Sequence, residues 1–142
     1  MTLHLIKLCV GAQSIDDLAQ WQKKRLAERR KKKLPLVLQH VTRMTPKRAD
    51  ELLDGGSLYW VIKGRIAARQ KLVALKAVRK DGKPHCALVY EPKIIPVMWR
   101  HHRPFQGWRY FDPKDAPPDI RDIRAGNLPE KLKTELAGLG LL

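Results

Sequence analysis

Cysteine and serine are scarce in this sequence of 142 residues, and their scarcity excludes several kinds of chemistry. The two cysteines, Cys9 and Cys86, each lie within an apolar run, which favours buried thiols in a reducing compartment over a disulfide. The two serines, Ser14 and Ser57, lie outside any Gly-x-Ser-x-Gly turn, so a serine hydrolase is not expected. The Gly-Gly pair at 55–56 is typical of a helix end and not of a phosphate-binding loop.

Long hydrophobic runs are also missing. No segment approaches the roughly 20 apolar residues that cross a bilayer. Residues 1–10 alternate in polarity and do not form the continuous apolar core of a secretory signal. We therefore expect a cytoplasmic protein, bacterial or organellar, that has no membrane partner.

Acidic residues are few compared with basic ones. Lysine and arginine number 29 against 14 acidic residues, which gives a net charge of +15 and a pI of ≈ 10.2. Such a charge opposes compaction by self-repulsion and indicates a polyanionic partner, for which a nucleic acid is the first candidate. The apolar fraction of 44 % is that of a globular protein, and the length predicts one domain over residues 1–142.

Hydrophobic periodicity and turn residues predict the order of the elements. Ser14 is the predicted N-cap of a helix that runs from residue 15 to about residue 32. Thr45 and Pro46 are predicted to start a second helix, over residues 47–53. Strands are expected over 3–10, 36–43, 57–62, 85–90 and 106–111, with a hairpin turn at 81–84. Residues 65–80 fit strand or helix, Pro92 and Pro96 are expected to break the chain, 112–119 to form a loop, and 129–139 a terminal helix.

This order favours an α+β fold over a doubly wound parallel sheet. Strands and helices alternate only in the first third of the chain, and the remainder is dominated by strands. We expect a single domain with a curved, mostly antiparallel sheet or a small β-barrel, with flanking helices.

The densest basic segment is 21–33, which holds eight cations and one acid. Its cations, including Lys31 and Lys32, point all around the predicted helix end. A solvated helix end that complements the helix dipole would explain them. Phosphate neutralisation would explain them equally, because each neutralised phosphate releases counterions.

A second basic segment follows the aromatic residue Trp60. If it is a strand, Lys63, Arg65 and Arg69 lie on one face by parity, and three cations on one face attract an anion. A surface ladder paired with acids elsewhere is the alternative. Trp60 is a candidate to stack a base beside this face.

A third segment, 99–111, interleaves cations with aromatic rings, which is the combination on which single-stranded bases stack. Its candidate binding residues are Arg103, Trp108, Arg109 and Tyr110. Core packing and cation–π contacts within the fold are the alternative roles. The adjacent His101 and His102 would face opposite sides of a strand with no carboxylate or cysteine at ligand spacing, so no metal site is predicted.

No catalytic constellation stands out, and the catalytic residues, if any, are unknown from the sequence. The candidate acid–base groups are His40, His85, His101 and Glu91, which no motif brings together. No cofactor is expected.

Seven segments resemble the bacterial "domain of unknown function 1489" family: LIKLCVG at 5–11, HVTRM at 40–44, PKRADELL at 46–53, GSLYWVIKG at 56–64, ARQ at 68–70, RPFQGWRY at 103–110 and DAPPD at 115–119. The resemblance covers nearly the whole chain and implies no activity or cofactor. The strand at 61–64 and the basic strand after it also resemble, at the level of the fold, the PUA-like domains with their ASCH and EVE branches. That likeness implies a small β-barrel that binds RNA or modified bases.

The sequence and these resemblances thus predict a nucleic-acid-binding module with a basic cleft and aromatic stacking, and RNA is favoured over DNA as its partner. Two alternatives stay open. One is an enzyme acting on a nucleotide or a modified nucleic acid. The other is an assembly factor that docks on an acidic partner or the ribosome.

Overall fold

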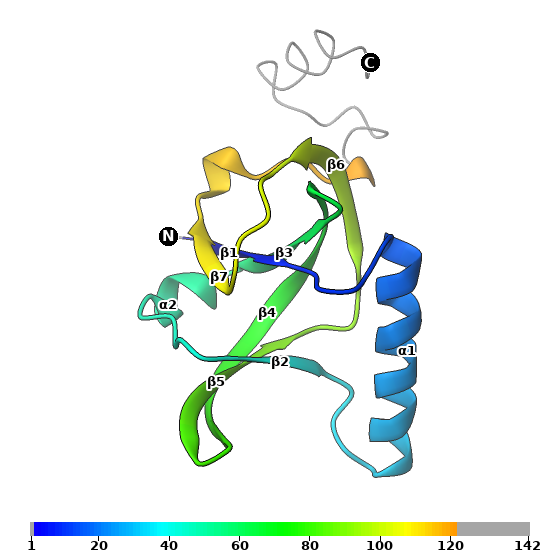
Figure 1. Cartoon of the computed structure of the whole chain (residues 1–142), viewed down its shortest axis with the longest axis vertical. Coiled ribbons are helices and arrows are strands. Elements are labelled where there is room, and N and C mark those ends of the chain that lie inside the picture. The colour runs from blue at the N-terminus through cyan, green and yellow to red at the C-terminus, as the bar shows by residue number, and fades with distance from the viewer. Residues whose placement is uncertain (1, 122–142) are drawn as a thin grey trace, which may run out of the picture.

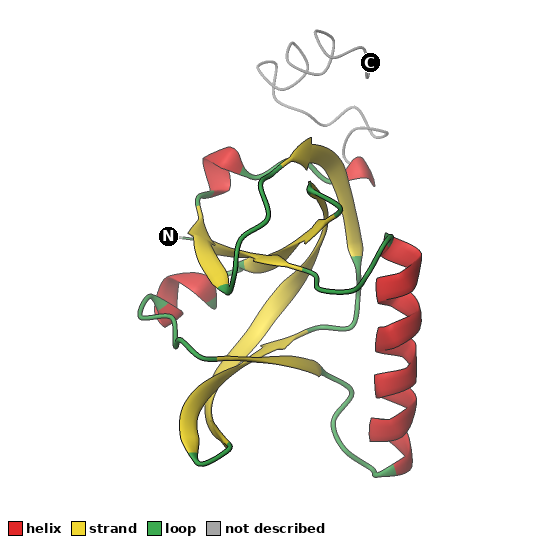
Figure 2. Ribbon diagram, viewed as in Figure 1, coloured by secondary structure: helices red, strands yellow, loops and turns green. Residues whose placement is uncertain are grey.

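The computed structural model describes residues 2–121 as seven strands, two α-helices and a short 3-10 helix (Figures 1 and 2). In chain order the elements are β1 (His4–Leu8), α1 (Ile15–Lys31), β2 (Leu38–Thr42), α2 (Ala49–Leu52), β3 (Ser57–Ile62), β4 (Arg65–Lys80), β5 (Lys83–Tyr90), β6 (Ile95–His101), β7 (Trp108–Phe111) and η1 (Pro113–Asp115). The expected α+β class is confirmed. The helix predicted over 129–139 lies outside the described residues.

The long strand β4 organises the sheet. Its first half pairs with β3 on one edge and with β6 on the other, and its second half pairs with β5. The strand order is β2-β5-β4-β3-β1-β7, with all pairs antiparallel except β1 with β3. In Figure 1, β4 runs obliquely through the whole molecule, with β1, β3 and β7 at one end and β2 and β5 at the other.

The sheet is curved and open, because β2 and β7 are its two ends in the described residues. Side chains of β7 span the gap between those ends. The Trp108 indole nitrogen donates to the Met44 carbonyl at 2.8 Å, and the Tyr110 hydroxyl accepts from the backbone nitrogen of Lys47 at 2.8 Å. Of the two expected forms the curved sheet is therefore the one observed, and the strands within residues 2–121 do not close into a barrel.

Two apolar clusters lie on opposite faces of the sheet. The larger one is on the concave face, where Leu5, Leu58, Trp60 and Leu88 are buried and α1 contributes Leu18. The smaller one is on the other face: Ile6, Tyr59, Val61, Ile66 and Val97. Both cysteines are buried and free. Across residues 2–121, no helix is both long and apolar enough to cross a lipid bilayer.

Local signals placed several elements correctly. Ser14 caps α1, with its hydroxyl accepting from the Asp17 backbone nitrogen at 3.2 Å. The hairpin turn consists of Asp81 and Gly82, both with positive φ (54° and 76°), as a two-residue turn requires. Residues 65–80, which fitted strand or helix, form the strand β4.

Two expectations were wrong. The helix α2 begins after Arg48 and not after Thr45. The Tyr110 hydroxyl accepts from the backbone nitrogens of Lys47 and Arg48 and holds that segment outside the helix. Pro96 does not break the chain but lies within β6, because the strand pairs through one edge with β4 and an outer strand tolerates a missing donor.

Candidate functional site

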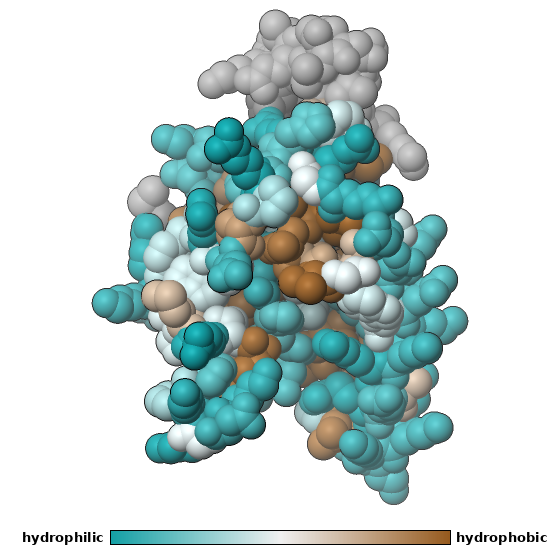
Figure 3. All heavy atoms as spheres, in the orientation of Figure 1, coloured by the Kyte–Doolittle hydropathy of each residue, from teal (hydrophilic) through white to brown (hydrophobic). Residues whose placement is uncertain are grey.

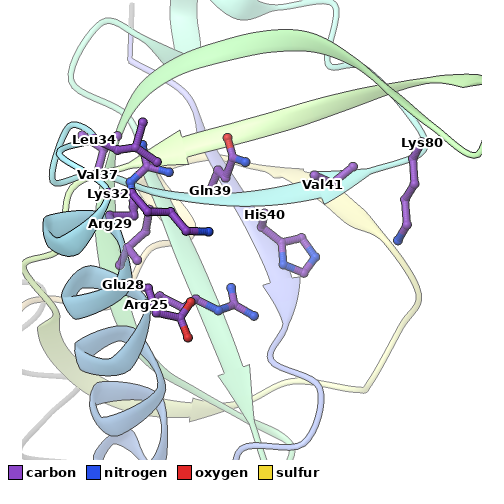
Figure 4. Close-up of a pocket in the computed structure, with 11 residues that line it drawn as sticks. Arg25, Glu28, Arg29, Lys32, Leu34, Val37, Gln39, His40, Val41 and Lys80 are labelled. Carbon is purple, nitrogen blue, oxygen red and sulfur yellow. The ribbon is translucent and has the colours of Figure 1, made fainter.

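A groove of about 480 Å³ runs along β2 between α1 and the tip of the β4–β5 hairpin. Figure 4 shows Arg25 and Lys32 extended from α1 toward β2, with Lys80 on the far side of His40. Arg29 also lines the groove, so four cations surround it, and Glu28 is the one acidic residue among its described lining. We call this cavity the basic groove. In Figure 3 the surface is hollowed between the hairpin and α1, and hydrophilic side chains line both flanks.

The helix presents three of these cations together because of their spacing. Arg25, Arg29 and Lys32 are four and three residues apart, and residues at such intervals lie on one face of a helix. The last turn of α1 is also the end at which cations complement the helix dipole. The Arg29 Nε donates to the Pro35 carbonyl at 2.7 Å, which fixes the loop that leads from α1 into β2.

A smaller cavity of about 110 Å³ adjoins the basic groove at Arg25 and His40, which line both. We call it the inner cavity. Its walls are mainly apolar or aromatic and come from β1, α1, β3 and β5: Leu8, Cys9, Val10, Leu18, Trp21, Trp60 and Tyr90, with Gln22.

Buried amide groups hold the wall of the inner cavity in place. The side chains of Gln22 and Gln70 hydrogen-bond each other reciprocally, with both distances 2.7 Å. The oxygen of Gln70 also accepts from the Trp60 indole nitrogen at 2.8 Å, and its nitrogen donates to the Glu91 carbonyl at 3.0 Å. Because both amides are partnered, this network fixes α1 and the Trp60 ring against the sheet.

A third cavity of about 420 Å³ lies in the gap between β2 and β7. Lys7 lies at its floor, only 8 % exposed, and in the strand register it stands between Trp60 and Trp108. Burial lowers the pKa of this lysine. Arg43 lines the same cavity, and Val41 lines both this cavity and the basic groove. The three adjoining cavities are thus lined by basic side chains and indole rings, from α1 at one end to β7 at the other.

Two histidines are neutral at physiological pH. Burial, with the charges of Lys7, Arg25 and Lys80, lowers the pKa of His40 to about 4. Burial and the charge of Arg69, which together outweigh Asp112, lower the pKa of His4 to about 4. The His4 Nδ1 accepts a hydrogen bond from the Ser57 backbone nitrogen at 2.9 Å, and this bond requires the unprotonated atom.

We expect the folded protein to lose stability as the pH falls from 6.5 toward 4. Both histidines have an ordinary pKa of 6.5, so the unfolded chain takes up protons in this range and the folded chain resists them. We expect a loss of about 1–2 kcal/mol per histidine, because both rings are partly exposed. Urea unfolding at about pH 7 and about pH 4.5 measures it.

His4→Asn keeps an acceptor for the Ser57 nitrogen without the titrating ring, and we expect it to be less sensitive to acid than the wild type. His101→Gln, at an exposed position on β6, is the matched control and should behave as the wild type does. Equal acid sensitivity in His4→Asn and the wild type would contradict the role of His4.

Three of the ten residues singled out from the sequence line these cavities. Lys32 lines the basic groove, Trp60 the inner cavity and Trp108 the third cavity. Lys31 is exposed on the same helix but lines none of the three.

The expectation that Lys63, Arg65 and Arg69 share one face was wrong. Lys63 lies in the β3–β4 turn, with a positive φ of 52°. A bulge then leaves Ala67 unpaired, since Ile66 opposes Val61 and Ala68 opposes Trp60. The extra residue turns Arg65 and Arg69 to opposite faces of the sheet.

The contacts of Arg69 give it a role in holding the fold together. It makes two hydrogen bonds with the Asp119 carboxylate, at 2.8 and 2.7 Å, and donates to the Ser57 hydroxyl at 2.9 Å. Burial alone would raise the pKa of Asp119, but the hydrogen bonds and charge of Arg69 hold that pKa below its ordinary value. The ion pair fixes the segment around Asp119 to β4.

The remaining candidates make local contacts elsewhere. Arg65 stacks over the exposed Trp99 ring, with 4.5 Å from the guanidinium carbon to the ring centroid, and Arg109 stacks over Phe105 at 4.7 Å. Tyr110 uses its hydroxyl to bind the loop before α2. Arg103 is exposed in the loop between β6 and β7.

Sequence reasoning missed most of the groove. The spacing of Arg25, Arg29 and Lys32 was a signal that could have separated them from the other cations of α1. Lys80 of the groove and Lys7 of the third cavity carried no such signal, because only the pairing of distant strands places them there. Of the acid–base candidates, His40 lines the groove, whereas His85, His101 and Glu91 line none of the three cavities.

Residues 5–142 match the model of the family described as "Protein of unknown function (DUF1489)", which confirms the resemblance seen in the seven segments. No curated protein matches the chain. No solved structure matches it either, and the likeness to PUA-like domains gains no support from this comparison.

Proposed function

The chain belongs to the DUF1489 family, whose description names no activity, and we propose from its geometry that it is a nucleic-acid-binding module that takes RNA in the basic groove. The observation that carries the proposal is the groove itself. Four cations and one acid line a concave surface of about 480 Å³ on a chain with a net charge of +15. Phosphate groups are the natural counterions for such a surface.

The groups around the groove favour single-stranded nucleic acid over duplex. The exposed ring of Trp21 and the partly exposed ring of Trp108 lie in cavities next to the basic groove. Aromatic faces stack unpaired bases, whereas the bases of a duplex already stack on each other. A strand with its phosphates in the groove would have bases within reach of these rings.

The groove also offers groups that favour RNA over DNA. Glu28 is unfavourable for a phosphate, but its carboxylate can accept a hydrogen bond from a ribose 2′-hydroxyl. Gln39 and the neutral His40 ring can donate or accept in the same place. The 2′-hydroxyl is both donor and acceptor, and DNA lacks it.

Binding should be strongly salt-dependent. With four phosphates neutralised by the groove cations, the logarithm of the association constant should fall with the logarithm of salt with a slope of about −3, or about 50-fold between ~50 and ~200 mM. Fluorescence anisotropy with labelled single-stranded RNA, duplex RNA and duplex DNA measures it. We expect the single-stranded RNA to bind most tightly. Weak binding with equal affinity for single-stranded RNA, duplex RNA and duplex DNA would contradict the proposal and favour docking on an acidic protein partner.

A further inference from the structure

The inner cavity is placed to take one base of a strand that lies in the basic groove. The two cavities meet at Arg25 and His40. A phosphate held by Arg25 therefore has the mouth of an apolar cavity beside it. We propose that the inner cavity binds one unpaired pyrimidine base, an inference that rests on the proposed RNA-binding function.

The size of the cavity favours a pyrimidine over a purine. The inner cavity measures about 110 Å³. An apolar cavity of about 150 Å³ in another protein holds benzene, which is a single six-membered ring. The inner cavity adjoins the groove at Arg25 and His40, so a six-membered ring can lie in it with its polar edge toward these two residues. The second ring of a purine would have to lie outside a cavity of this volume.

The walls match the two kinds of surface that a base has. Trp21, which is 42 % exposed, provides an aromatic face on which the ring can stack, and the buried Trp60 and Tyr90 form part of the apolar wall. At the mouth, the neutral His40 has one donor and one acceptor nitrogen, and Arg25 has donors, which suit the carbonyl and amino groups of a pyrimidine edge.

The wall of the cavity is held in place, and Arg25 is the one charged residue among its described lining. Gln22 and Gln70 hydrogen-bond each other and Gln70 also binds Trp60, so this part of the wall is positioned before a base enters. The Cys9 thiol stays protonated, because burial raises its pKa to about 11. No described acidic side chain lines the cavity to repel the adjoining phosphate.

Reducing the space in the cavity from an exposed position tests the proposal without disturbing the core. Val10 lines the inner cavity and is 75 % exposed, so the larger side chain of Val10→Trp should occupy space that the base needs and leave folding intact. Val73→Trp is the matched control, since Val73 is also exposed and lines none of the three cavities. The probes are labelled octamers of uridine, cytidine and adenosine, measured by fluorescence anisotropy.

We expect the wild type and Val73→Trp to bind both pyrimidine octamers about tenfold more tightly than the adenosine octamer, the worth of one stacked base. Val10→Trp should reduce this preference to about twofold or less and leave the affinity for the adenosine octamer unchanged. The bases of an adenosine octamer stack on one another in the free strand, which by itself weakens binding. The test is therefore the difference in pyrimidine preference between Val10→Trp and the control Val73→Trp.

The outcomes separate this inference from the proposed function. If Val10→Trp keeps the same pyrimidine preference as the control, or if the wild type shows none, the cavity is not a base pocket, and the groove remains an RNA site. If the wild type binds none of the octamers with the expected salt dependence, both the groove and the cavity proposals fail.

Discussion

Replacing Arg25 and Lys32 by glutamate is expected to lower the affinity for single-stranded RNA by about 100-fold or more. Both side chains line the basic groove, and each hydrogen bond to a charged phosphate is worth about 1.5–3 kcal/mol. Reversing the charges adds repulsion to the loss of these contacts. The salt slope should also fall by at least about 1.4, because two of four cations are gone. Anisotropy titrations at several salt concentrations measure both quantities.

The same helix offers a closely matched control. Lys24 and Lys31 have the same separation of seven residues, are exposed, and line none of the three cavities. Lys24→Glu with Lys31→Glu gives the same change in net charge and puts glutamates in the same turns of α1. We expect a loss of about tenfold or less, from long-range attraction alone. If the two double variants lose equal affinity, the charge of the protein and not its groove determines binding.

Arg69→Ala is expected to lower the free energy of unfolding by about 3 kcal/mol, because it leaves the Asp119 carboxylate buried with one of its cations removed. The remaining cation, Arg121, is 3.4 Å away and largely exposed. Urea unfolding measures the loss. Arg65→Ala is the control on the same strand, and its exposed contact with Trp99 should be worth about 1 kcal/mol or less.

A double variant distinguishes the cost of leaving Asp119 without Arg69 from the cost of any substitution at position 69. Arg69→Met combined with Asp119→Leu removes both charges, and we expect it to recover most of the lost stability. If Arg69 instead bound phosphate, Arg69→Ala would keep its stability and lose affinity for RNA. That result would support the sequence-based prediction that Arg69 binds nucleic acid.

Local chemistry explains which features the sequence predicted well. The cap Ser14, the apolar spacing of α1 and the Asp81–Gly82 turn depend on neighbours within a few residues, so their effects can be recognised along the chain. The run of aromatic and β-branched residues that forms β3 is of the same kind. The α+β class follows from the order of these elements, and the family follows from the seven segments that resemble it.

Other features depend on residues that are distant along the chain. The Tyr110 hydroxyl determines where α2 begins, from 62 residues away. Pro96 is tolerated because β6 lies on the outer edge of β4. One bulge at Ala67 separated Arg65 from Arg69, and no local signal marked that residue.

The candidate site also combines features that the sequence determines with features that depend on the tertiary structure. The composition alone established that the chain is strongly basic, and the helix period placed Arg25, Arg29 and Lys32 on one face of α1. Only the tertiary structure brought His40 and Lys80 to that face, because strand pairing decides which side chains of β2 and β4 lie near each other. A charge is a property of the chain, whereas a groove is a property of how distant segments pack.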